Sequence, residues 1–390
     1  MSEVIEIENN YHFQMYNRYP VVLEKGLGSK VWDENGKEYI DALSGIAVNA
    51  LGYSHPDILE IMNEQASKLI HTSNFFYTKA NSDLAKNLCE LSGMDRAFFV
   101  NSGAEATEGA MKIARYYNYK KGKPESEIIS LENSFHGRTI ATIGIGQKKY
   151  QEGFGPLPGA TKKAIINDID SLIRAINQRT GAVIIETVQG EGGVTVANGD
   201  YLKEVQKICN DRGILLIMDE VQSGNSRTGE LYAYQNYGIE PDIMCTAKGL
   251  AAGFPIGAVA AKEEVASILE RGKHGSTFGG NPLACAIANK TLEIIANRDF
   301  LNQVKAKGKY FLSKLENLLK DNSKVKEIRG IGLMIGVELN EESRPIALKM
   351  LENGVIVSAT AGTVIRIVPP LVINYDEIDK VIEVLVNCLD

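Results

Sequence analysis

The chain has 390 residues, of which 44% are apolar and 23% are charged, and its formal net charge is −7. This length is too great for one small core, so we expect two domains, and the apolar content is typical of a globular protein. The negative charge and the lack of a basic, aromatic-rich segment argue against a nucleic-acid-binding protein.

The cysteines and the N-terminus indicate where the protein acts. Five cysteines are scattered without CxxC spacing: Cys89, Cys209, Cys245, Cys285 and Cys388. This pattern argues against a disulfide framework or a zinc site, so we expect no metal and a reducing, cytoplasmic location. The acidic N-terminus has no apolar signal core, and no run of about 18 apolar residues predicts a transmembrane helix.

In chain order, a hairpin comes first and is followed by alternating strands and helices. Two short runs, residues 30–32 and 38–40, flank a turn at Asp33-Glu34-Asn35-Gly36 and predict the hairpin. Helices are then expected at residues 56–71, 105–120 and 200–212, and strands at 97–100, 128–131, 182–185 and 256–261. This alternation over residues 80–285 predicts a parallel or mixed sheet covered by helices.

The character of the chain changes after Pro282. Helices are expected at residues 283–297, 300–320, 343–353 and 375–388, with strands at 332–338 and 363–368. We therefore expect a smaller α+β domain, which the N-terminal hairpin could join. The predicted division is residues 1–60 for the N-terminal segment of the small domain, 61–284 for the large domain and 285–390 for the rest of the small domain.

A lysine and an aspartate follow two short apolar runs that predict buried parallel strands. Residues 214–218 lead into Asp219, and residues 242–245 precede Lys248. Ligands of open α/β sheets bind at the carboxyl ends of strands. An amine and a carboxylate placed there suit pyridoxal phosphate (PLP), which bonds to a lysine and pairs its pyridine nitrogen with an acid. The other interpretation of Lys248 is a solvated loop residue, and the glycines that follow it, Gly249, Gly253 and Gly257, favour a ligand site.

Two segments could hold a phosphate. Residues 101–105 (Asn-Ser-Gly-Ala-Glu) follow a predicted strand and open a helix, where free N–H groups and the helix dipole attract anions. The same segment also reads as an ordinary helix start, with Ser102 and Glu105 forming a capping box. Residues 275–282 are rich in glycine and hydroxyl groups and end at a proline suited to a helix start.

Several further side chains are candidates for substrate binding. Phe135 could stack on a planar cofactor, and Arg138 could hold a carboxylate through two hydrogen bonds. Glu191 lies in a glycine-rich loop, and Arg366 interrupts an apolar strand, where a charge is expected to be paired or functional. His136 has no evident partner in the sequence, and we expect a structural role for it.

Together these segments resemble the class III (subgroup II) aminotransferases, PLP enzymes of fold type I. The motifs that carry the resemblance are Asn101-Ser102-Gly103-Ala104-Glu105-Ala106, Phe135-His136-Gly137-Arg138-Thr139, Gln189-Gly190-Glu191-Gly192-Gly193, Asp219-Glu220-Val221-Gln222, Ala247-Lys248-Gly249 and Gly279-Gly280-Asn281-Pro282. The resemblance runs from Tyr16 to the C-terminus. Segments at residues 16–20, 45–52 and 73–78 are similar to the acetylornithine branch. The fold it implies is α/β, with a mainly parallel seven-stranded sheet in the large domain.

The resemblance assigns a role to each matching residue. Lys248 would bond to PLP and shuttle protons, Asp219 would keep the pyridine nitrogen protonated, and Phe135 and Val221 would pack on opposite ring faces. Gln222 would reach the ring oxygen. The phosphate would be held by residues of the segments described above, Ser102, Gly103 and Ala104, with Thr277 reaching in from a partner subunit of a homodimer.

The substrate-binding residues would be Arg138, Glu191 and Arg366. Arg138 would bind the carboxylate far from the reacting carbon. Glu191 would neutralise Arg366 while an ω-amine donor is bound and would swing away when glutamate or 2-oxoglutarate brings a second carboxylate. The implied reaction moves the δ-amino group of N-acetylornithine to 2-oxoglutarate, giving N-acetylglutamate 5-semialdehyde and glutamate in arginine biosynthesis.

Other donors and one other class of function remain open. The same motifs serve ornithine, succinyldiaminopimelate and 4-aminobutyrate, and a non-catalytic PLP-binding relative is the alternative outside enzymes. Ile46 stands near the place where ornithine aminotransferases carry a tyrosine, which favours an acylated donor. Asn225-Ser226 departs from the Ile-Gly or similar pair usual in the family, so the shape of this loop is in question.

Overall fold

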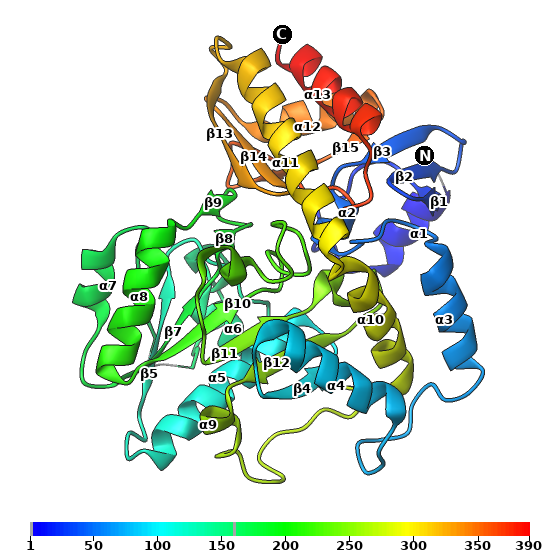
Figure 1. Ribbon diagram of the computed structural model, residues 1–390. Helices are drawn as coiled ribbons and strands as arrows, with labels where there is room; N and C mark the ends of the chain where they lie inside the picture. Colours follow the sequence, from blue (N-terminus) through cyan, green and yellow to red (C-terminus); the bar gives the residue numbers. More distant parts are fainter. Residues whose placement is uncertain (1–2, 159–160) are drawn as a thin grey trace.

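The computed structural model describes residues 3–158 and 161–390. The larger part of the molecule is built around a seven-stranded sheet, as the family resemblance implied (Figure 1). The strands in spatial order are β4 (Arg96–Val100), β12 (Gly257–Ala261), β11 (Ile243–Thr246), β10 (Leu215–Asp219), β7 (Thr180–Ile185), β5 (Glu127–Leu131) and β6 (Thr161–Ala164). Strand β12 runs antiparallel to both of its neighbours, and the other pairings are parallel. The sheet is therefore mainly parallel, and six strands end at the same edge.

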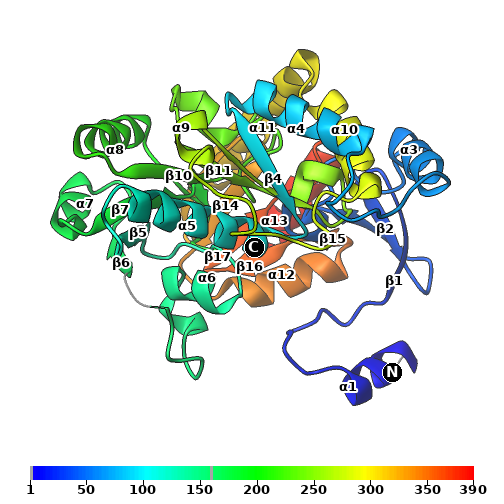
Figure 2. The same ribbon diagram turned by 90° about the horizontal axis from the view of Figure 1, so that it is seen from below.

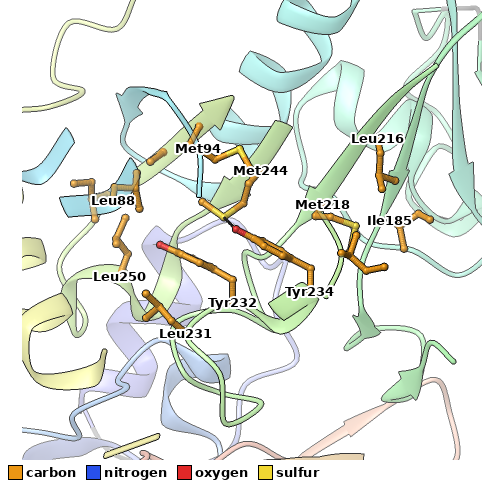
Figure 3. Close-up of a cluster of buried hydrophobic side chains, with 14 of the residues drawn as sticks. Leu88, Met94, Ile185, Leu216, Met218, Leu231, Tyr232, Tyr234, Met244 and Leu250 are labelled. Carbon is orange, nitrogen blue, oxygen red and sulfur yellow. Dashed lines mark hydrogen bonds between the residues drawn. The ribbon is translucent and has the colours of Figure 1, made fainter. Parts of the chain in front are cut away.

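Both faces of this sheet are buried, which explains why its strands are continuous apolar runs. In β10, Leu215 and Ile217 belong to a core cluster with α5 (Gly103–Lys120), whereas Leu216 and Met218 belong to the cluster on the opposite face. Figure 3 shows part of that second cluster, where the parallel rings of Tyr232 and Tyr234 lie among leucine and methionine side chains.

Helices cover the sheet on both sides. The remaining helices of this part of the chain are α3 (Pro56–Ala66), α4 (Lys79–Ser92), α6 (Ile140–Ile145), α7 (Ile169–Ala175), α8 (Gly199–Arg212), α9 (Glu263–Ala266) and α10 (Pro282–Ile295). Short 3-10 helices are η1 (Lys148–Tyr150), η2 (Ala233–Tyr237) and η3 (Lys248–Ala251), and a small ribbon pairs β8 (Val188–Gln189) with β9 (Thr195–Val196).

The C-terminal part forms a second layer of strands and helices with its own core (Figure 1). An antiparallel sheet contains β13 (Val325–Ile331), β14 (Met334–Leu339), β17 (Val364–Ile367) and β16 (Ser358–Thr360). Helices α11 (Arg298–Leu319), α12 (Ser343–Glu352) and α13 (Tyr375–Leu389) share a core cluster with this sheet. The residue limits that we expect for the two domains stay a prediction.

The N-terminal hairpin joins this C-terminal part. Strands β1 (Leu23–Leu27), β2 (Lys30–Asp33) and β3 (Glu38–Asp41) are antiparallel, and β15 (Val355–Ile356) adds to β3 in parallel. The short helix α2 (Ser44–Ala47) follows β3. Helix α1 (Glu3–Tyr11) has no buried residue and lies away from the main body (Figure 2).

Most expected elements are present, with a few differences. The helix expected at 56–71 ends at Ala66, and exposed residues follow it. Neither α4 nor β6 was predicted. Strand β6 reads Thr-Lys-Lys-Ala, which lacks the apolar run of a central strand because β6 is the outermost strand of the sheet.

Three further features concern residues 3–158 and 161–390. None of their helices combines the length and the apolar character needed to span a bilayer. No group of three acidic, histidine or cysteine side chains among them is arranged to hold a metal ion. The five cysteines are free thiols.

Candidate active site

A cavity of about 400 Å³ opens at the carboxyl edge of the large sheet. It is lined by most of the residues that the sequence singled out: Ser102, Gly103, Ala104, Phe135, Arg138, Asp219, Val221, Gln222 and Lys248. These residues lie in the segments that follow β4, β5, β10 and β11 or at the strand ends themselves. The parallel topology therefore gathers side chains that are up to 146 positions apart in the sequence, from Ser102 to Lys248.

The start of α5 forms one end of the cavity. Ser102 caps this helix by accepting a hydrogen bond from the Glu105 N–H at 3.2 Å, while the Glu105 carboxylate accepts from the Asn101 N–H. The first N–H groups of a helix have no partner within it, so those of Gly103 and Ala104 remain for an anion. A Cβ on Gly103 would lie 2.6 Å from Val221 Cγ1, so only glycine allows the helix start to approach the cavity this closely.

Asp219 has a partner that the sequence did not reveal. Its Oδ2 lies 2.7 Å from His136 Nδ1, and its Oδ1 accepts the Val221 N–H at 3.0 Å. His136 is buried, lines the cavity, and has an Nε2 atom without a hydrogen-bond partner among the described residues. The sequence showed no evident partner for His136, because a contact between residues 83 positions apart depends on the order of the strands in the sheet. An ionised Asp219 requires the proton of His136 to be on Nδ1.

Lys248 begins η3 in a backbone conformation that is unusual for a residue with a side chain. Its φ angle is +47°, in the left-handed region. The Asn225 amide donates hydrogen bonds to the Ala247 carbonyl at 2.9 Å and to Thr246 Oγ1 at 3.1 Å. Burial lowers the pKa of the Lys248 amine to about 8, and the charge of Arg366 acts in the same direction. A lowered pKa provides more neutral amine, which is the nucleophilic form.

Arg366, which is buried, forms an ion pair with the half-buried Glu191 next to the lysine. Arg366 Nη1 lies 2.5 Å from Glu191 Oε1 and 3.3 Å from Gln222 Oε1, and its Nε donates to Ser358 Oγ. The Arg366 side chain is 3% exposed and that of Glu191 is 22% exposed. Burial alone would raise the pKa of Glu191, but the charge and hydrogen bond of Arg366 lower it, so the carboxylate stays ionised.

Arg138 is held differently. Its guanidinium carbon lies 3.8 Å from the centre of the Tyr150 ring and 5.5 Å from that of Phe135. Phe135 in turn meets the edge of Tyr150 at a centroid distance of 5.7 Å. Arg138 is exposed and lines the cavity, so its charge is available to a ligand.

Glu186 is a cavity residue that sequence reasoning missed. It directly follows β7, accepts the Phe135 N–H at 3.0 Å, and is 5% exposed. Burial and the nearby Asp219 charge raise its pKa well above the usual range of a glutamate. Glu186 could have been predicted in the same way as Asp219, because it also stands at the carboxyl end of a predicted strand.

Glu191 and Arg366 lie beside the cavity, where Arg366 contacts Gln222, and are not among the residues that line it. Two further positions that the resemblance singled out also lie outside the lining. Thr277 is exposed and does not line the cavity of its own chain. Ile46 is 40% exposed, and Val48 provides the nearby wall of the cavity instead.

Comparison with known proteins connects this geometry with a family. Residues 12–389 match the family described as aminotransferase class-III. The chain belongs to the class III aminotransferases. An acetylornithine aminotransferase of Methanocaldococcus jannaschii is 52% identical over 388 residues, covering 99% of this chain and 96% of that protein. Another, from Caldanaerobacter subterraneus, is 46% identical over 389 residues, covering 99% of both.

Solved structures of an ornithine aminotransferase and an acetylornithine aminotransferase have a similar fold. The ornithine aminotransferase of Toxoplasma gondii has a TM-score of 0.95 at 34% identity, covering 99% of this chain and 94% of that one. The acetylornithine aminotransferase of Elizabethkingia anophelis has a TM-score of 0.89 at 34% identity, covering 99% and 98%. A second Toxoplasma gondii structure records PLP at the active site.

Class III aminotransferases are PLP-dependent, and the cavity fits this cofactor. It offers unpaired helix N–H groups beside a glycine that must lack a side chain, an aromatic ring, a buried carboxylate and a lysine amine of lowered pKa. This set matches the phosphate, ring, pyridine nitrogen and aldehyde of PLP. The protein is thus a PLP-dependent aminotransferase.

Proposed function

We propose that this protein transfers the δ-amino group of N-acetylornithine to 2-oxoglutarate, as a step of arginine biosynthesis. Support comes from the relatives named acetylornithine aminotransferase, which are 43–52% identical over nearly the whole chain. The products would be N-acetylglutamate 5-semialdehyde and glutamate.

The observation that carries this proposal is the Arg366–Glu191 pair. An ω-amine donor brings no carboxylate close to the carbon that reacts. Without Glu191, Arg366 would then be a buried charge without a partner. Glu191 neutralises it. Glutamate and 2-oxoglutarate bring an α-carboxylate that can replace Glu191 on Arg366, so one cavity would accept both kinds of substrate.

The cofactor would be held by residues that line the cavity. Bound PLP supplies an electron sink that stabilises negative charge on the substrate carbon. The N–H groups of Gly103 and Ala104, with Ser102, would hold its phosphate, and Phe135 and Val221 would enclose its ring.

The polar side chains around the ring would complete the site. Asp219 would hold the pyridinium proton, with His136 orienting the Asp219 carboxylate. Gln222 accepts from Arg366 through Oε1, which leaves its amide N–H groups for the ring oxygen. Lys248 would carry the proton between the substrate carbon and the cofactor, because its amine has a pKa near 8 and can both accept and donate at neutral pH.

A homodimer with shared sites forms part of the proposal. Thr277 is exposed, and the loop that carries it is tied to the body through Ser276, whose Oγ accepts from Asn101 Nδ2. A nearby segment exposes large apolar side chains, with Phe75 at 92% and Tyr77 at 100% exposure. Such a surface favours association, and Thr277 would then reach the phosphate in the partner's cavity. A cytoplasmic location fits the five free cysteines.

The decisive experiment is an absorbance titration of the PLP-loaded protein with N-acetylornithine, ornithine, succinyldiaminopimelate and 4-aminobutyrate. We expect the visible band of the lysine-bound cofactor to disappear at the lowest concentration with N-acetylornithine. A preference for ornithine would agree with the name of the Toxoplasma gondii structure and would overturn the proposed donor. Lys248→Ala should abolish turnover with every donor, and normal turnover of this variant would contradict the role of Lys248.

A further inference from the structure

The two arginines of the site are held by opposite means. Arg366 is buried and paired with the Glu191 carboxylate. Arg138 makes no ion pair with any residue among 3–158 and 161–390, and the groups recorded in contact with its guanidinium are the rings of Tyr150 and Phe135. This difference calls for an explanation, because Arg138 lines the cavity and Arg366 contacts Gln222, another residue of the cavity lining.

Tyr150 is the closer of the two rings and is well placed as a support. It ends η1, is half-buried, and lies with its ring centre 3.8 Å from the guanidinium carbon of Arg138. Its ring edge also meets Phe135 at an interplanar angle of 83°. Lys149 places a second cation 4.9 Å from the same ring centre.

A ring holds an arginine without neutralising it. The quadrupole of an aromatic face attracts the cation but leaves the five N–H donors of the guanidinium free in their plane. A carboxylate at the same place would occupy those donors and would compete with any carboxylate of the substrate. The ring therefore fixes the orientation of Arg138 while its charge stays available.

We propose that Tyr150 is a positioning residue that keeps Arg138 permanently ready for the distal carboxylate of the substrates. The inference rests on the proposed function, in which N-acetylornithine and 2-oxoglutarate both carry a carboxylate far from the reacting carbon. Arg138 would bind a carboxylate in both half-reactions, so its guanidinium must stay free of other carboxylates. Arg366 would bind one in a single half-reaction, and Glu191 pairs with it in the other. Tyr150 thus contributes to specificity without contacting the substrate.

The test compares Tyr150→Leu, which removes the ring, with Tyr150→Phe, which keeps it. Tyr116→Leu is the matched control, because Tyr116 also lies near a lysine, with Lys120 Nζ 5.4 Å from its ring centre, but does not contact Arg138. All proteins are loaded with PLP, and thermal unfolding checks that they are folded. Tyr150→Met is a second ring-free variant in case the leucine variant does not fold.

Each variant is measured with two matched pairs of substrates. 2-Oxoglutarate is compared with pyruvate, which lacks the distal carboxylate, and N-acetylornithine is compared with N-acetylputrescine, which lacks it too. For Tyr150→Leu we expect kcat/KM to fall roughly tenfold for the substrate of each pair that carries the distal carboxylate, mainly through a higher KM. For the substrate that lacks this carboxylate, kcat/KM should change less than about twofold. Tyr150→Phe should keep the wild-type discrimination, since it is the Tyr150 ring that contacts the guanidinium of Arg138. Weaker binding of the unreactive dicarboxylate glutarate provides a readout independent of turnover.

The outcomes separate this inference from the proposed function. An equal loss for both members of each pair would mean that Tyr150 only supports Phe135, and the inference would be overturned. It would also be overturned if Tyr150→Phe behaved like Tyr150→Leu, or if neither variant differed from wild type. If wild type ignores N-acetylornithine but Tyr150→Leu loses 2-oxoglutarate selectively, the proposed donor is wrong and the role of Tyr150 is supported.

Discussion

Replacing Glu191 by glutamine tests the gate directly, because the change removes a charge and keeps nearly the same shape. In the wild-type protein the carboxylate of Glu191 lies 2.5 Å from Arg366 Nη1, and in the proposed function an incoming α-carboxylate would have to displace it. In Glu191→Gln the competitor is a neutral amide. We therefore expect the reaction with glutamate to improve and the reaction with N-acetylornithine to weaken.

The size of the effect follows from the burial of the pair. Two unit charges about 4 Å apart interact by about 4 kcal/mol at an effective dielectric constant of about 20. The cost of removing the two charges from water offsets much of this attraction. The hydrogen bond of Arg366 to a carboxylate then contributes about 1.5–3 kcal/mol net, whereas its hydrogen bond to the amide of Glu191→Gln contributes about 1 kcal/mol. The difference of about 0.5–2 kcal/mol predicts a decrease of about two- to thirtyfold in the KM for glutamate.

The same substitution should raise the KM for N-acetylornithine several-fold. Arg366 would then be an unpaired buried cation near the ammonium group of the donor, and like charges repel. Both half-reactions can be followed separately through the absorbance of the bound cofactor. The control is Glu263→Gln, which breaks an exposed pair with Arg96 at 2.6 Å far from the cavity. A KM for glutamate that rises, or equal changes for both substrates, would refute the gate.

Three further predictions concern the support of the site. Asn225→Leu leaves the buried carbonyl before Lys248 without its donor, and should lower the free energy of unfolding by about 1–3 kcal/mol in urea titrations and also reduce kcat. Rebinding of PLP to the cofactor-free protein should accelerate as pH rises through about 8, because the neutral Lys248 amine reacts; a stopped-flow series that shows a midpoint near the ordinary lysine value would contradict this. Arg227→Met leaves the carbonyls of Leu333 and Pro369 without a buried donor, and should cost about 2–4 kcal/mol in the same urea assay, with Arg227→Lys less affected.

Local sequence predicted the strand ends better than it predicted the contacts between them. The apolar runs before Asp219 and Lys248 identified two central strands, because strands buried on both faces have no polar alternation. The pairing of His136 with Asp219 could not be predicted in this way, since it depends on the spatial order of strands that are distant in sequence. Asn225 was noted only as a departure from the family, and its amide bonds to the lysine loop require the folded chain.

We infer that the proposed exchange of Glu191 for a substrate carboxylate on Arg366 is a side-chain movement within a fixed backbone. The Glu191 carbonyl accepts a hydrogen bond from Thr360 Oγ1 at 3.2 Å, and the Gly193 carbonyl accepts one from Arg329 Nη2 at 2.6 Å. Both donors belong to the C-terminal sheet, which also carries Arg366 on β17. The loop and the arginine are thus held to the same sheet, so moving the loop away would break these bonds as well as the ion pair. A rotation of the Glu191 side chain alone breaks one ion pair, which the α-carboxylate of glutamate replaces with another. The energetic difference between the two states is therefore small, as a site that serves two substrates in alternation requires.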